Sequence, residues 1–273
     1  VLKTMLPATW LNARRRTVLI FIDRGERGVE RLAVARYAVG SLFPGAWDPE
    51  TQPDQYQRIA ELLEEADPNK IALNTSDDYA LADGLTYSEQ RDFASALSPT
   101  LRSRVVSAEA LAVGWLETRT EKEMEVYADV MAIAHAIIAE GFSRRAIEPG
   151  STTTEDLEWW FRQRVHDLGL RTWFHNSIEI ERPAAATNAL RAAGLDTEVI
   201  HPGDHVHIDF GISYLNLQTD TQQNAYILRA GESEAPAYLQ RALAEGNALQ
   251  DILTDNFQVG RTGNEILART RAQ

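Results

Sequence analysis

The sequence predicts an α/β fold of the α+β kind, arranged as two domains. Strand-like and helix-like segments alternate over the first third of the chain, which is typical of a small sheet covered by helices. A long amphipathic helix then opens a second set of helices and strands. The 273 residues correspond to about two domains of ordinary size, and we expect these domains to span residues 1–116 and 117–273.

The first domain is predicted to alternate short strands with helices. Runs of β-branched and apolar residues indicate strands, and apolar residues at every third or fourth position indicate helices. Pro68 stops the first helix, and Ser88 is expected to cap the second. In chain order the elements are strands at 17–22 and 32–39, a helix at 55–66, a strand at 70–74, a helix starting near Ser88, a strand at 105–107 and a helix at 108–115.

Two capped helices are expected at the start of the second domain. Thr120 and Glu123 have the spacing of a capping box, in which the side chains and backbone of a helix start bond reciprocally. Thr152 and Glu155 repeat that spacing ahead of the next helix. In chain order we predict helices at 121–140 and 157–168, then strands at 206–210, 212–217 and 225–228 within a strand-rich region from 172 to 228.

A weak internal repeat links two helix starts. Residues 150–157 and 260–267 both read G-x-T-x-x-E-x-L, and each copy follows a long helical segment. Chance agreement is the alternative, because turn glycines and capping boxes recur in many proteins. Strands follow the first copy, whereas the sequence stops at Gln273 soon after the second. A helix pair must bury its apolar face, so we expect the chain to be a fragment that lacks residues at both ends.

The charge and composition exclude several classes of protein. The net charge is −13, from 27 Lys and Arg against 40 Asp and Glu, so the surface as a whole repels nucleic acid. The local exception is Arg14-Arg15-Arg16, which we interpret as a solvated turn before a strand. Because the chain has no cysteine, disulfides, thiolate metal sites and a cysteine nucleophile are excluded. The sequence also lacks a Gly-rich phosphate loop and a G-x-S-x-G nucleophile elbow.

No membrane partner is expected either. The sequence has no run of about 18 apolar residues, which a membrane-spanning helix would need. Its first residues form too short an apolar stretch for a secretory signal. We therefore expect a cytoplasmic protein, with a periplasmic or secreted location left open because a signal peptide could precede Val1.

The clearest chemical signal lies in the predicted strand at 206–210 and the turn before it. Alternate residues of a strand share a face, so His205, His207 and Asp209 are expected to point one way, opposite to the apolar residues between them. Asp220 lies eleven positions after Asp209. If this strand pairs antiparallel with the next one, the two carboxylates come within about 5 Å of each other across the ladder.

Two neighbouring carboxylates repel each other, so either one takes a proton or a cation binds between them. Divalent ions prefer carboxylate oxygens, imidazole adds affinity for transition metals, and pairs of carboxylates bridge the ions of many two-metal hydrolases. The alternative is that Asp209 is an ordinary strand-end residue and Asp220 a turn residue. His205 and His207 have the alternative of being half-buried sheet residues.

Several motifs carry a family resemblance. A Gly-Asp pair, an apolar strand, Asp-x-Gly, ten residues between two aspartates and an aromatic strand follow one another from Pro202 to Leu228. The motifs are Gly203-Asp204, Asp209-Phe210-Gly211, Asp220, the Glu148-Pro149-Gly150 turn, and Asp83-Gly84-Leu85-Thr86 in the first domain. Together they resemble the pita-bread metallopeptidases, which include Xaa-Pro aminopeptidase, prolidase and methionine aminopeptidase, with creatinase as a relative without metal.

The resemblance implies a creatinase-like N-terminal α/β domain followed by a partial pita-bread domain, with its first repeat and the start of its second. It implies two divalent metal ions (Mn, Co or Zn) with Asp209 and Asp220 as ligands, one bidentate and one bridging. The family's remaining ligands, a His and two Glu, have no counterparts before Gln273, and the general-base Glu is expected beyond it. This incomplete set leaves open whether the chain by itself is an enzyme.

The resemblance also implies a substrate class, a peptide with proline at its second position, and it is compatible with a homodimer. His175, Arg182 and His207 are weaker candidates for substrate contacts. The sequence departs from the family where an Arg often follows the second aspartate, since Thr221-Gln222-Gln223 stands there. The resulting hypothesis is a metal-dependent, aminopeptidase-like hydrolase that cleaves Xaa-Pro bonds when full length. The alternatives are a non-catalytic binding protein on the same fold and a hydrolase of a non-peptide amide.

Overall fold

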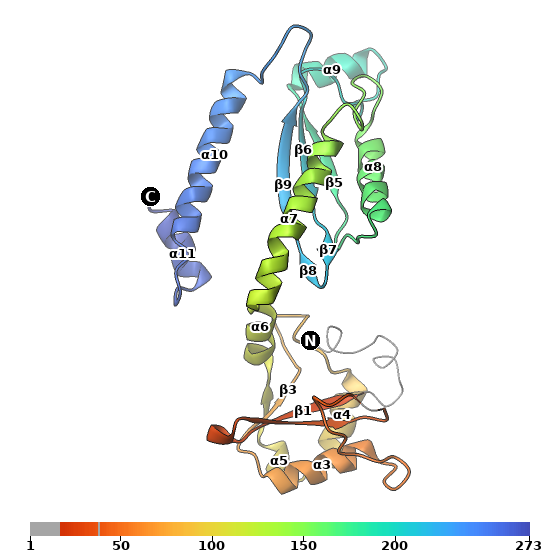
Figure 1. The fold of residues 1–273 in the computed structure, drawn as a ribbon, viewed down its shortest axis with the longest axis vertical. Helices are drawn as coiled ribbons and strands as arrows, with labels where there is room; N and C mark the ends of the chain where they lie inside the picture. The colour runs from red at the N-terminus through yellow and green to blue at the C-terminus, as the bar shows by residue number, and fades with distance from the viewer. Residues whose placement is uncertain (1–16, 38) are drawn as a thin grey trace. The chain divides into compact units, whose positions relative to one another are not determined.

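The computed structural model describes residues 17–37 and 39–273, and its contacts separate the chain into two units (Figure 1). Unit 1 is Val1–Thr120 and unit 2 is Glu121–Gln273. The basic run Arg14-Arg15-Arg16 lies outside the described residues. None of the helices in the described part of the chain combines the length and the apolar character that a bilayer span requires.

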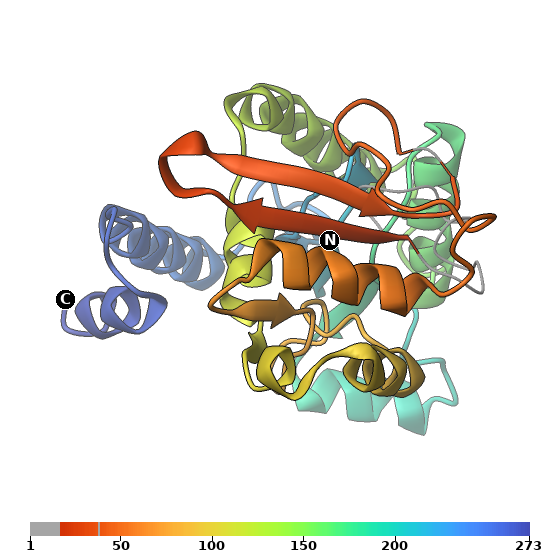
Figure 2. The same ribbon diagram turned by 90° about the horizontal axis from the view of Figure 1, so that it is seen from below.

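Unit 1 combines two small sheets with short helices. Its elements are β1 (Val18–Asp23), the 3₁₀ helix η1 (Gly25–Arg27), β2 (Val29–Val34), α3 (Gln55–Ala66), β3 (Ile71–Leu73), α4 (Tyr87–Ala96), α5 (Pro99–Arg102), β4 (Val105–Ser107) and α6 (Glu109–Glu117). β1 and β2 pair antiparallel, and β3 pairs with β4 in parallel. α3 contacts both β2 and α4 (Figure 2). Buried residues of these elements, among them Ile59, Leu62 and Phe93, form one apolar core.

The second strand of unit 1 differs from its predicted position. It is β2, which ends at Val34, rather than a strand at 32–39. The chain reverses directly after β1 in a tight turn that bonds the N–H of Gly28 to the carbonyl oxygen of Gly25. Both glycines have positive φ, which residues with a Cβ rarely adopt. The early reversal brings the second strand forward, whereas the helix predicted at 55–66 is confirmed as α3.

The cap of α4 is Thr86 rather than the predicted Ser88. The Thr86 hydroxyl accepts a hydrogen bond from the backbone N–H of Glu89, and the Glu89 carboxylate accepts one from the Thr86 N–H. This reciprocal capping box satisfies two N–H groups that a helix start leaves without partners. The helix therefore begins one residue before Ser88, which lies inside its first turn.

Unit 2 is built on a three-stranded antiparallel sheet. Its elements are α7 (Glu121–Gly141), α8 (Thr154–Asp167), β5 (Ser177–Glu181), α9 (Ala184–Ala192), β6 (His205–Phe210), β7 (Ser213–Tyr214), β8 (Leu217–Gln218), β9 (Thr221–Tyr226), α10 (Ala237–Asp255) and α11 (Gly263–Thr270). The strand order is β5-β6-β9, so β6 is the central strand. β7 and β8 form a separate small hairpin between β6 and β9.

One face of this sheet and the two helices before it form the core of unit 2. Val206, Ile208 and Phe210 of β6 are fully buried and pack with apolar residues of α7 and α8. The rings of Phe161 and Phe210 have centroids 5.2 Å apart. Gly141 of α7 makes this packing possible, because a Cβ there would lie 2.2 Å from the Phe161 ring. The apolar side of β6 is thus closed by helices.

The strand predicted at 212–217 is wrong. Its residues form the β7–β8 hairpin, which turns at Leu215 and Asn216 with φ values of 50° and 62°. Two consecutive residues with positive φ give the tight reversal of a two-residue hairpin loop. β9 begins at Thr221, ahead of the strand predicted at 225–228. The partner of β6 is therefore β9.

The two copies of the internal repeat start their helices differently. In the second copy Thr262 and Glu265 form the predicted capping box. In the first copy the box consists of Thr153 and Asp156, one position after the predicted pair. The hydroxyl of Thr152 instead accepts a hydrogen bond from a backbone N–H four residues earlier. Three successive threonines offer alternative caps, which explains the shift by one residue.

The helices that follow β9 contribute nothing to this core. No residue of α10 is buried, and α10 and α11 contact each other. Large apolar side chains of this region are exposed, including Leu243, Leu249 and Phe257. The core of unit 2 thus consists of α7, α8, the sheet and the segments between them.

Candidate metal centre

The first predicted ligand, Asp209, lies on the face of the sheet opposite to the core. It belongs to the central strand β6, between Ser177 of β5 and Gln222 of β9. His205 and His207 share this face, which confirms the alternation predicted for the strand. The polar face therefore presents two imidazoles and one carboxylate along a single strand.

Asp220 directly precedes β9 and lies at the same end of β6 as Asp209. Phe210 pairs with Thr221, the first residue of β9, so Asp220 lies one step beyond the last pair of the ladder. Its side chain is exposed. The structure brings the two aspartates together, but by pairing β6 with β9 and not by pairing β6 with a strand at 212–217.

The surroundings of Asp209 disfavour an isolated negative charge. Burial raises the pKa of the Asp209 carboxyl above its usual value, the charge of Asp220 raises it further, and His207 lowers it. In the described part of the chain, three buried side-chain atoms lack a hydrogen-bond partner: Asp209 Oδ1, Thr221 Oγ1 and His201 Nε2. Two of these three atoms thus belong to Asp209 and to the residue that follows Asp220.

Two of the weaker candidates, His207 and His175, also lie at the Asp209 end of the sheet. The Nε2 atom of His207 is 3.2 Å from Oε1 of Gln222. His175 lies two residues before Ser177, which pairs with Asp209. Its Nδ1 atom is 2.7 Å from the carbonyl oxygen of the next residue.

The third weak candidate, Arg182, lies at the other end of the strand pair. It follows β5, five positions and about 16 Å along the strand from Ser177, the partner of Asp209. Its side chain is 5% exposed and forms an ion pair with Asp204, in which Nε and Nη2 bond the two carboxylate oxygens. It also donates to two carbonyl groups within residues 197–199. Arg182 is thus not brought to the aspartate pair.

The donor set for a metal ion at this place is partial. Among residues 17–37 and 39–273, no cluster of three or more His, Cys, Asp or Glu side chains could hold a metal ion. Asp209 and Asp220 provide two carboxylates, one of them with a buried oxygen that has no partner. Such an oxygen suits a divalent cation, which binds carboxylates directly and relieves their mutual repulsion. The residues present fit part of a coordination shell.

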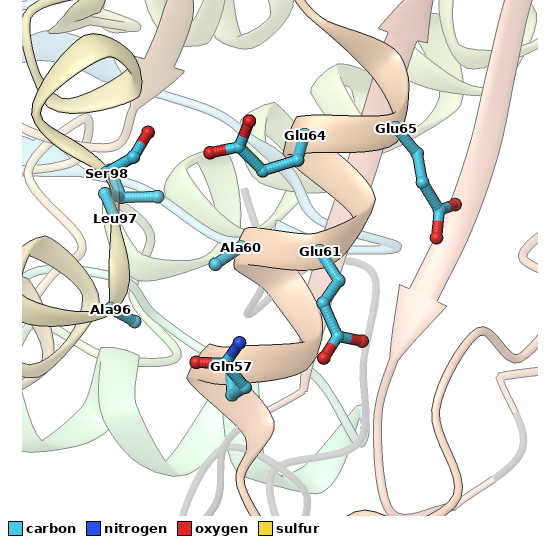
Figure 3. A pocket seen from close by; sticks show the side chains of 8 residues that line it. All are labelled: Gln57, Ala60, Glu61, Glu64, Glu65, Ala96, Leu97 and Ser98. Atoms are coloured by element: carbon cyan, nitrogen blue, oxygen red, sulfur yellow. The ribbon is translucent and has the colours of Figure 1, made fainter.

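An open cleft of about 510 Å³ lies elsewhere, between α3 and the end of α4 in unit 1. Figure 3 shows that Glu64 points toward the Leu97–Ser98 side, whereas Glu61 and Glu65 extend from the other side of α3. Glu61 is engaged by Gln52 and Arg58. The residues that line the cleft are Gln57, Ala60, Glu61, Glu64, Glu65, Ala96, Leu97 and Ser98. The acidic groups do not converge, so this cleft does not rival the aspartate pair as a metal site.

Sequence reasoning missed a contact that bears on the site. Thr219 directly precedes Asp220 and is fully buried, and its carbonyl oxygen accepts a hydrogen bond of 2.8 Å from the indole N–H of Trp173. The two residues are 46 positions apart, so no local periodicity connects them. The one available signal was Gly211 after Asp209, because a glycine there indicates a close approach of other atoms.

The family of the chain is decided by a sequence comparison. The family model described as "Metallopeptidase family M24" matches residues 126–272. The chain belongs to metallopeptidase family M24. Membership confirms the resemblance to the pita-bread metallopeptidases and implies divalent metal ions. No curated protein matches the sequence.

Solved structures of M24-type peptidases share the fold at low sequence identity. The X-Pro aminopeptidase of Thermotoga maritima MSB8 is similar over 94% of this chain and 74% of its own, with 15% identity and a TM-score of 0.55. The Xaa-Pro dipeptidase of Bacillus anthracis is similar over 85% of this chain and 59% of its own, with 19% identity and a TM-score of 0.52. Aminopeptidase P of E. coli is similar over 94% of this chain and 60% of its own, with 14% identity and a TM-score of 0.56.

The chain corresponds to part of each of these proteins. The chain spans between 59% and 74% of the length of the three proteins. At identities of 14–19% the likeness shows the fold, and it confirms the predicted mixed α/β class of the pita-bread proteins.

Proposed function

We propose that Asp209 and Asp220 hold a divalent metal ion in a peptidase that cleaves Xaa-Pro peptide bonds. The observation that carries the proposal is Asp209 Oδ1, which is buried without a hydrogen-bond partner and has the like charge of Asp220 beside it. A bound cation supplies the missing partner and offsets the repulsion between the carboxylates. Membership in a metallopeptidase family supports the same assignment.

The proposed ion is Mn, Co or Zn. Carboxylate oxygens suit divalent cations in general, and imidazole adds affinity for transition metals. His207 supplies an imidazole on the face that carries Asp209. A second ion is the finer part of the proposal, and it requires donors in addition to these carboxylates, since the described residues hold no larger ligand cluster.

The chemistry follows from the site and its face of the sheet. When bound, a divalent ion polarises a peptide carbonyl group and lowers the pKa of water. Asp209 and Asp220 bind the ion, and Gln222 orients the His207 ring through its hydrogen bond. The opposite face of β6 is closed by α7 and α8, so a substrate approaches from the polar face. None of the described residues is assigned as the base that transfers the proton.

The proposed substrate is a peptide with proline at its second position. The support is the printed activity of proteins with the same fold, which are an X-Pro aminopeptidase, an Xaa-Pro dipeptidase and an aminopeptidase P. A homodimer is also proposed, on the family resemblance. Light scattering of the purified protein would then give about twice the mass of one chain.

Metal binding tests the site directly. Addition of the 273-residue chain to Mn²⁺ should reduce the electron paramagnetic resonance signal of free Mn²⁺. Asp209→Asn should weaken this binding by at least about tenfold, because it removes a charged ligand. Asp255→Asn, at an exposed position of α10, is the matched control and should bind Mn²⁺ like the unchanged chain. Absence of Mn²⁺ binding by this chain would contradict the two-carboxylate site, and its absence in the longer protein as well would favour the non-catalytic scaffold.

Activity tests the substrate class. The intact mass of the purified protein, compared with 30.5 kDa, first shows whether further residues accompany this sequence. Hydrolysis is then measured with Mn²⁺ on an Ala-Pro peptide and on the matched Ala-Ala peptide. Preference for the Ala-Pro peptide supports the proposal. Mn²⁺ binding by the longer protein without cleavage of either peptide would contradict the peptidase and favour a non-peptide amide as substrate.

A further inference from the structure

The β7–β8 hairpin between the two aspartates is fastened at its base. The backbone N–H of Thr219 donates to the carbonyl oxygen of Ile212 at 2.9 Å, and the N–H of Ile212 donates to the Thr219 hydroxyl at 3.0 Å. Both residues are fully buried. The Thr219 side chain thus closes the loop that begins after Asp209 and ends at Asp220.

A third hydrogen bond fixes the peptide group that joins Thr219 to Asp220. The carbonyl oxygen of Thr219 belongs to this peptide group, and it accepts the 2.8 Å bond from the Trp173 indole. The segment that carries Trp173 is itself attached to the hairpin, because the carbonyl oxygen of Arg171 accepts a 2.7 Å bond from the N–H of Ser213. The indole therefore restrains the backbone immediately before the second aspartate.

Gly211 gives the indole room to reach this position. A Cβ at Gly211 would lie 2.3 Å from the Thr219 carbonyl oxygen, 2.5 Å from the Phe174 ring and 2.7 Å from Trp173 Nε1. The Trp173 and Phe174 rings meet edge to face, with centroids 4.7 Å apart. Glycine at the position after Asp209-Phe210 is therefore required by the contact that restrains Asp220.

The exposure of Asp220 makes such a restraint necessary. An exposed side chain gains little from packing, so its carboxylate is positioned by its backbone and by the residues that hold that backbone. Asp209, in contrast, lies within the ladder of the central strand. A metal ion that binds both carboxylates needs a fixed separation between them, and the hydrogen bonds at Thr219 restrain the backbone of the more exposed aspartate.

We propose that Trp173 and Thr219 are positioning residues for the metal site, acting through the peptide group before Asp220. This inference rests on the proposed function of Asp209 and Asp220. Both side chains bond backbone groups, so each would act on the site through the backbone that it holds in place. Outer groups of this kind commonly change metal affinity by about 10–100-fold when removed.

The test measures Mn²⁺ affinity of the 273-residue chain by electron paramagnetic resonance, together with the spectrum of bound Mn²⁺ and the melting temperature. Trp173→Phe keeps an aromatic ring and removes the indole N–H. Thr219→Val keeps the shape and removes the hydroxyl, whereas Thr219→Ser restores it. We expect about tenfold weaker Mn²⁺ binding for the first two variants, an altered bound spectrum, and near-native values for Thr219→Ser. Trp159→Phe, on the exposed surface of α8, is the matched control.

The possible outcomes separate this inference from the proposed function. If Asp209→Asn loses Mn²⁺ while Trp173→Phe and Thr219→Val bind it like the unchanged chain, the positioning role is overturned and the metal site stands. If Thr219→Ser is as weak as Thr219→Val, the loss reflects packing, and the role assigned to the hydroxyl is overturned. If the unchanged chain binds no Mn²⁺, both proposals fail. The expected order of affinities, with Thr219→Ser restored, supports both.

Discussion

The two ends of β6 each carry an aspartate, and the fold treats the two carboxylates differently. Asp204, directly before β6, is 4% exposed, and both of its oxygens bond Arg182 while one also accepts from the N–H of His201. Asp209, near the other end, has a buried oxygen with no partner in the described chain and the charge of Asp220 beside it.

The difference separates a carboxylate that the fold pairs internally from the carboxylate that we propose as a metal ligand. At the Asp204 end the chain supplies its own cation, the guanidinium of Arg182, and the ion pair joins the end of β5 to the turn before β6. At the Asp209 end the chain supplies a second anion instead. A buried negative charge without a cation is unfavourable, so the Asp209 end favours either a proton or the external cation proposed for it.

The largest expected loss of stability follows from breaking the ion pair of Arg182 and Asp204. Arg182→Met leaves the Asp204 carboxylate buried without its cation and should lower the free energy of unfolding by about 3–5 kcal/mol. Urea denaturation followed by circular dichroism measures this change. Arg144→Met, at an exposed position, is the control and should have an effect below about 0.5 kcal/mol. Equal stability of the two variants would contradict the structural role of the ion pair.

Substitution of the glycine near each end of β6 should destabilise the protein by different amounts, with the larger loss at Gly211 than at Gly203. Gly211→Ala places a Cβ 2.3 Å from a backbone oxygen, and we expect a loss of about 3 kcal/mol because backbone and two rings must move. At Gly203 the nearest atoms belong to the flexible Arg229 side chain, which can move away. Gly203→Ala should therefore cost only the strain of its φ of 98°, about 1–2 kcal/mol. Chemical denaturation of both variants would reveal a reversed order, which contradicts this reasoning.

Added metal should act at only one end. Mn²⁺ at ten times its dissociation constant should stabilise the chain by about 1.4 kcal/mol, since it binds the folded state alone. For a chain of this size that corresponds to a rise in melting temperature of about 3–5 °C. The rise should disappear with EDTA and in Asp209→Asn, and it should persist in Asp255→Asn. A rise that Asp209→Asn retains would place the bound ion elsewhere.

The smallest effect is expected for Asp209→Asn without metal. The substitution removes a half-buried charge and its repulsion with Asp220, so the free energy of unfolding should rise by up to about 1 kcal/mol. Urea denaturation in the presence of EDTA measures it. A clear loss of stability would mean that Asp209 is satisfied by the fold, as Asp204 is, and would remove the contrast between the two ends.

Patterns that act over a few residues were predictable from the sequence. The alternation of His205, His207 and Asp209 follows from the period of a strand. The two aspartates do come to the same end of β6, but through β9 and not through the strand predicted at 212–217. The capping box of Thr262 and Glu265 was also correct. In each case the physical cause lies within one element or at one turn.

The errors have causes outside the local pattern. Leu215 and Asn216 adopt positive φ, yet Leu rarely does so, and the apolar run around it resembles a strand. The ion pair of Arg182 and Asp204 joins residues 22 positions apart. The hydrogen bond from Trp173 to the Thr219 carbonyl oxygen depends likewise on tertiary structure. Packing between distant segments decided these features, and sequence spacing carries little information about it.

The exposure of α10 has a consequence for local unfolding. The helix α10 has 19 residues, none of its side chains is buried, and its largest contact is with α11, so it gains little stability from packing. Its amide protons should exchange with deuterium quickly, through local opening of the helix. Those of the central strand β6 should exchange slowly, because they require cooperative opening of the sheet. The strand that carries Asp209 belongs to the core that α7, α8 and the sheet form, so we expect α10 to open without opening that core.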